Sequence, residues 1–86
     1  MRLPLIKKLT EFVEDNRDED FLIETIETLE ALSEVSSIKD EELDVIGELL
    51  SNLYGAVEVQ KDISSGTPRK EALNTFMKRV TGSIDQ

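Results

Sequence analysis

Residues 40–63 read DEELDVIGELLSNLYGAVEVQKDI, and this stretch decides the fold. On a helix, at about 100° per residue, its apolar residues cover one broad side: Leu43, Ile46, Leu49, Leu50, Leu53, Tyr54, Ala56 and Val57. Val45, Val59 and Ile63 widen that side to more than half of the circumference. A surface helix normally carries a narrower apolar stripe, of about 100°. We therefore expect a central helix over residues 40–64, covered by other helices or by a second copy of the chain.

Three further amphipathic segments surround this stretch in the sequence. They are expected to form narrower helices at about residues 4–15, 18–35 and 68–81. No segment shows the alternation of apolar and polar residues that is typical of a strand. The chain has no linker long enough to divide domains. The sequence therefore predicts a single all-α domain over residues 1–86, a small four-helix domain with a long central third helix.

The expected helix ends follow from capping residues. Asp18 suits the N-cap of the second helix, and either Ser37 or Asp40 suits that of the third. For the fourth helix we expect Thr67 as N-cap, Pro68 as the first helical residue, and an end near Gly82.

Composition restricts the chemistry that the chain can carry. The 86 residues include no cysteine and no histidine, which excludes thiol nucleophiles, Ser-His-Asp triads and His-Cys metal sites. A chain of this length buries only about 60–68% of its unfolded surface, and it has no disulfide to stabilise it. We expect a protein that is not an enzyme, with no cofactor and no metal, in which dimerisation supplies additional burial.

Charge restricts the partners. The formal net charge is −9, and residues 1–66 carry 17 acidic and 6 basic residues. Such a surface repels nucleic acid and anionic membranes and favours a protein partner with a basic surface. No apolar run approaches the length of a membrane span, and the first residues lack the apolar region of a signal peptide. A cytoplasmic protein is the expectation.

The excess apolar width of residues 40–63 predicts a homodimer that forms through the third helix. The chain is then a protein-interaction or structural module. The candidate interface residues are Val45, Leu49, Leu53, Tyr54, Gly55, Val59 and Ile63. Gly47, Ser51 and Gly55 are spaced four apart, which indicates either a close helix crossing, within the chain or across the dimer, or tolerated flexibility.

An alternative hypothesis is a carrier protein modified at Ser36 or Ser37. A pair of serines before an acidic helix, in a small acidic helical chain, resembles the acyl carrier proteins. Those proteins attach phosphopantetheine to the serine of an Asp-Ser-Leu motif, whereas this chain reads Val35-Ser36-Ser37-Ile38. The serines also follow a strongly amphipathic helix, where the carriers have a long loop. Helix punctuation is therefore the competing explanation for both serines.

Three stretches carry a second resemblance, which extends over nearly the whole chain. They are LPLIKKL at residues 3–9, DEELDVIGELLSNLYGAVEV at residues 40–59 and KEALN at residues 70–74. Together they resemble a family of short, acidic, all-helical bacterial proteins of unknown function. The resemblance implies a soluble, stand-alone helical protein and brings no activity, cofactor or functional residue with it.

Overall fold

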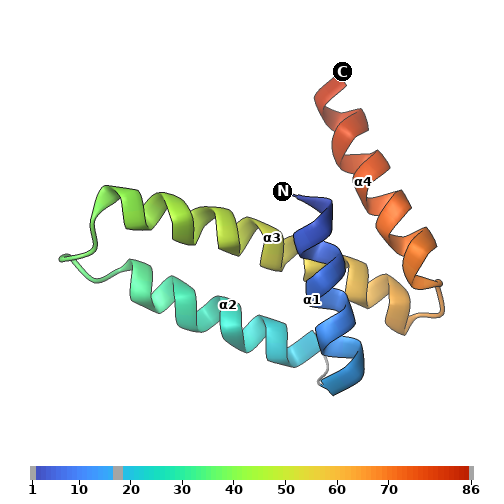
Figure 1. Cartoon of the computed structure of the whole chain (residues 1–86), viewed down its shortest axis with the longest axis horizontal. Coiled ribbons are helices and arrows are strands. Elements are labelled where there is room, and N and C mark those ends of the chain that lie inside the picture. Colours follow the sequence, from blue (N-terminus) through green and yellow to red (C-terminus); the bar gives the residue numbers. More distant parts are fainter. Residues whose placement is uncertain (1, 17–18, 86) are drawn as a thin grey trace.

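The computed structural model describes residues 2–16 and 19–85, and within them the chain forms four helices and no strand (Figure 1). The helices are α1 (Leu3–Asn16), α2 (Glu19–Ser33), α3 (Asp40–Ser64) and α4 (Arg69–Asp85). The all-α prediction is confirmed, and the third helix is the longest of the four, with 25 residues. Its expected bounds, 40 and 64, agree with the structure.

Three helix ends, one of α2 and two of α4, differ from expectation. α2 stops at Ser33 instead of Val35, because the N–H groups of Glu34 and Val35 bond three residues back and tighten the chain into turns. α4 begins at Arg69 instead of Pro68, since the Pro68 carbonyl accepts the first helical bond, from Ala72, at 2.9 Å. α4 also continues past Gly82 to Asp85; one helical glycine costs only about 1 kcal/mol.

Both ends of α3 are capped by local chemistry. The N-cap is Lys39, not Ser37 or Asp40, and its N–H donates to the carboxylate of Glu42 at 2.9 Å. At the other end, Gly66 has φ 114°, which a side chain rarely tolerates. The N–H groups of Gly66 and Thr67 bond the carbonyls of Ile63 and Asp62, which is a Schellman motif. Asp18, the expected cap of α2, lies outside the described residues.

The core lies against the C-terminal half of α3. α1 crosses α3 near its middle, α2 runs antiparallel to α3, and α4 turns back from the C-terminal end of α3 (Figure 1). The buried apolar residues that these helices bring together include Ile6, Val13, Leu22, Ile26, Leu53, Ala56, Val59, Ala72, Leu73 and Phe76. The prediction of a central third helix is therefore correct for this half.

The N-terminal half of α3 is covered much less. Every buried residue of α3 lies between Asn52 and Gln60, and none lies within residues 40–51. Figure 1 shows the reason: in this region only α2 lies alongside, and the two helices project from the rest of the molecule as a hairpin.

The molecule is flat. Its principal extents are 42 × 36 × 17 Å, and its radius of gyration is 13.9 Å. A compact domain of this length has a radius of gyration of about 12 Å. The chain is therefore more open than a typical domain of its size, and its helices have little covering on the broad sides.

α1 presents three different faces. Ile6, Thr10 and Val13 are fully buried against the core. An asparagine fixes the start of this helix on α3: the Arg2 N–H donates to Asn52 Oδ1 at 2.8 Å, and Asn52 Nδ2 donates to the Glu48 carbonyl. The two remaining faces of α1 border two separate depressions in the surface, which are described below.

Candidate interaction groove

An apolar groove lies where α1, α2 and the middle of α3 meet. It has a volume of about 220 Å³, and its lining is almost wholly apolar. α1 contributes Leu5 and Leu9, α2 contributes Leu29, and α3 contributes Leu49 and Leu53, with Lys8 and Asn52 completing the lining. Leucine side chains from three helices thus converge on a space that no part of the described chain fills.

Exposed apolar side chains extend the groove along the hairpin. Leu49 is 43% exposed, and Val45, one turn earlier on the same side of α3, is 58% exposed. On α2, Leu32 follows Leu29 by one turn and is 48% exposed. We call the following six residues the open apolar face: Val45 and Leu49 of α3, Leu29 and Leu32 of α2, and Leu5 and Leu9 of α1. It extends from the groove onto the N-terminal half of α3, which has only α2 beside it.

The structure divides the seven predicted interface residues into two groups. Val45, Leu49 and Tyr54 are exposed. The others are used within the chain, because Leu53, Gly55 and Val59 are buried and Ile63 packs against the core. Of these four residues, Leu53 also contributes to the groove lining, whereas the other three lie outside that lining.

Tyr54 lies on a different side of α3 from the groove. It follows Leu49 by five residues, which places it about 140° further around the helix. Its hydroxyl donates to the carboxylate of Glu30 on α2 at 2.5 Å. This hydrogen bond, with smaller contributions from burial and from the charge of Glu30, raises the pKa of Tyr54.

Tyr54 is the only tyrosine in a chain without tryptophan, so its titration is directly visible in the near-ultraviolet spectrum. We expect a midpoint above the ordinary value of about 10, and Glu30→Ala should lower it towards that value. Glu27→Ala, an exposed neighbour on α2, is the matched control and should leave the midpoint unchanged.

The sign of the stability effect follows from the direction of this shift. A raised pKa means that the folded state retains the phenolic proton more strongly than the unfolded chain does. This contribution to stability is present below about pH 10 and is lost as the pH rises further. An identical midpoint in the wild type and in Glu30→Ala would show that the hydrogen bond does not persist in solution.

The small residues of α3 do not all mark a close crossing. A β-carbon added at Gly47 meets no atom within 4 Å, whereas Gly55 is buried. No helix of the described chain therefore approaches α3 closely at Gly47.

Gly47→Ala is expected to stabilise the fold by up to about 1 kcal/mol, because alanine restricts the unfolded chain and meets no clash. Urea unfolding followed by circular dichroism measures the change. Ser51→Ala, one turn further along α3, controls for helix propensity. A loss of stability with Gly47→Ala would indicate that a second chain packs against this glycine.

Apart from Lys8, the charged side chains flank the groove and do not belong to its lining. The outward face of α2 is acidic, with Asp20, Glu24, Glu27 and Glu30 all exposed. Ile23 lies among these acids on α2 and is also exposed. The two arginines of α4 pair with other helices: Arg69 with Glu11 and Glu14 of α1, and Arg79 with Glu58 of α3.

The two serines of the carrier hypothesis lie in the exposed turn between α2 and α3. This position separates them from the groove lining.

Sequence reasoning missed the residues that complete the groove and anchor it. Leu5, Leu9 and Leu29 lie on the apolar sides of their helices, and only the tertiary arrangement shows that these sides meet around a gap. Asn52 had a detectable signal, because it is a polar residue inside the apolar stretch at 40–63. Gln60 is likewise a polar residue inside this apolar stretch. In the structure it is buried, and its Oε1 has no hydrogen-bond partner.

The fold and the groove define a small all-helical domain with one uncovered apolar face. Residues 1–85 match the model of the DUF6952 family, described as a family of unknown function, and the chain belongs to this family. No curated protein and no solved structure matches the chain. Within the described residues, no helix combines the length and apolarity needed to cross a membrane.

Proposed function

We propose that this chain is a protein-interaction or structural module that acts as a homodimer through the N-terminal half of α3. The observation that carries the proposal is the open apolar face around Leu49, where the groove lining has almost no polar surface. An exposed, contiguous apolar surface on a small protein is typical of an interaction site.

A second copy of the chain is the occupant that we propose. An apolar face is complementary to itself, and a twofold axis through it brings two identical faces together. A stable interface buries about 800 Å² per partner, an area that fits within the 42 × 36 Å broad side. Pairing also thickens a molecule that is only 17 Å deep and supplies burial that the open hairpin lacks.

Charge gives this dimer a characteristic salt dependence. Each chain carries a net charge of −9, so two copies repel one another at long range. The groove itself is apolar and its contacts are insensitive to screening. Added salt should therefore tighten the dimer, whereas it would weaken an association that depended on opposite charges.

Light scattering after size-exclusion chromatography tests the proposal. At micromolar concentration we expect twice the 9.7 kDa mass of one chain, with a dimer fraction that rises with salt. A strict monomer at low and high salt would contradict the homodimer and leave the face to a different protein.

The carrier hypothesis has an independent test. Modification of Ser36 or Ser37 requires a mass increase after expression with a phosphopantetheinyl transferase. Intact mass spectrometry that shows the unmodified chain would exclude it.

A further inference from the structure

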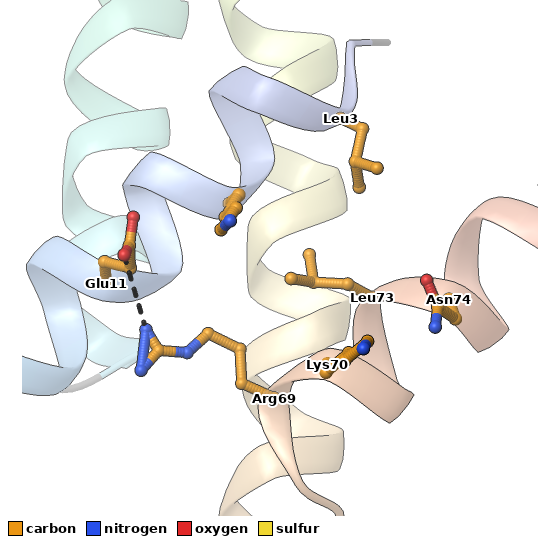
Figure 2. Close-up of a pocket in the computed structure, with 7 residues that line it drawn as sticks. Leu3, Glu11, Arg69, Lys70, Leu73 and Asn74 are labelled. Atoms are coloured by element: carbon orange, nitrogen blue, oxygen red, sulfur yellow. Dashed lines mark ion pairs between the residues drawn. The ribbon is translucent and has the colours of Figure 1, made fainter.

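A second depression lies between α1 and α4, apart from the apolar groove. It has a volume of about 510 Å³, compared with about 220 Å³ for the groove. Figure 2 shows the side chains of Leu3 and Leu73 in the space between the two helices. Leu73 is almost completely buried, so the two leucines provide an apolar floor.

The walls of this cleft are cationic. Lys7 of α1 and Arg69 and Lys70 of α4 line it, with Glu11 as the one carboxylate in the lining. The lining therefore has a local excess of positive charge in a chain whose net charge is −9. Charge on the walls of a cleft acts more strongly than on a convex surface, because low-dielectric walls focus the field.

The nearby carboxylates are already engaged. Arg69 pairs with Glu14 at 3.3 Å and with Glu11 at 3.8 Å. Glu14, the closer of these two partners, is not part of the cleft lining. No ion pair in the described chain involves Lys7 or Lys70, although both face a cleft in an acidic protein. The two ammonium groups thus remain available to an anion from outside the chain.

We propose that the α1–α4 cleft binds a small organic anion that joins a carboxylate to an apolar chain. The carboxylate lies near Lys7 and Lys70, and the apolar chain covers Leu3 and Leu73. Ligand pockets typically have volumes of about 300–1,000 Å³ and combine an apolar lining with a few polar groups. The first turn of α4, which carries Arg69 and Lys70, adds the positive end of its helix dipole.

The site does not depend on the homodimer, because its residues lie on a different face of α1. Leu3, Lys7 and Glu11 recur every four residues and border α4, whereas Leu5 and Leu9 border the groove. Binding in the cleft can therefore be measured whether the chain is a monomer or a dimer.

Titration of the ¹⁵N-labelled full chain with octanoate, followed by amide chemical shifts, tests the proposal. We expect saturable shifts in residues 3–7 and 69–74, with acetate binding far more weakly because it lacks the apolar chain. Lys7→Gln and Lys70→Gln should each weaken octanoate binding about three- to fivefold. Lys78→Gln makes the same charge change elsewhere on α4 and should leave the affinity unchanged.

Three results would overturn the site. One is the absence of saturable shifts at millimolar octanoate. A second is an equal loss of affinity in the Lys7→Gln, Lys70→Gln and Lys78→Gln variants, which would reflect net charge alone. The third is a set of shifts centred on Leu29, Leu49 and Leu53, which would place octanoate in the apolar groove.

Discussion

Replacement of Phe76 by alanine is expected to lower the free energy of unfolding by about 3–5 kcal/mol. Phe76 is the largest of the fully buried side chains and holds α4 against α3. A chain of 86 residues has a total stability of about 4–13 kcal/mol, so this single change removes a large part of it. Urea unfolding followed by circular dichroism measures the loss.

Two controls separate core packing from a local effect on α4. Phe76→Leu keeps most of the apolar volume and should cost much less than alanine. Thr75→Ala changes the adjacent, exposed residue and should stay within about 0.5 kcal/mol of the wild type. Amide exchange that becomes fast only in α4 of Phe76→Ala would show that this helix unfolds alone and that the core is not cooperative.

The fold was largely predictable because helix periodicity is a local signal. Leu22 and Ile26 recur at helical spacing on α2, and the small residues Ser36-Ser37 and Ser65-Gly66 lie between helices in the structure. The predictions that were wrong concern the residues at which helices begin, end or are capped. Lys39 caps α3 through its backbone N–H, a role that any residue type except proline can fill, so the identity of residue 39 does not mark it as the cap.

The site was predictable only in part, because the width of an apolar face does not show where neighbours cover it. Val45 and Val59 have the same side chain and lie on the same helix. Val59 is fully buried and Val45 is 58% exposed, because α1 and α4 both pack on the C-terminal half of α3. That difference arises from the crossing position of α1, which is a tertiary property and is absent from the pattern of residues 40–63.

Leu49→Glu is the variant with the largest expected effect on the dimer. Full burial of a leucine side chain contributes about 1.5–3 kcal/mol of free energy. In a symmetric dimer the substitution removes this contribution from both chains, and it also places two negative charges in the interface. We expect the dissociation constant to rise by at least about 100-fold, a loss of about 3 kcal/mol of binding free energy. Sedimentation equilibrium measures it.

The same substitution should leave the chain folded, which makes the result interpretable. Leu49 is 43% exposed, and glutamate is nearly as good a helix former as leucine. Leu43→Glu is the matched control: it lies about 120° around α3 from Leu49 and is similarly exposed. If Leu43→Glu dissociates the dimer and Leu49→Glu does not, the interface lies on the side of α3 that carries Tyr54, and the groove is not the contact.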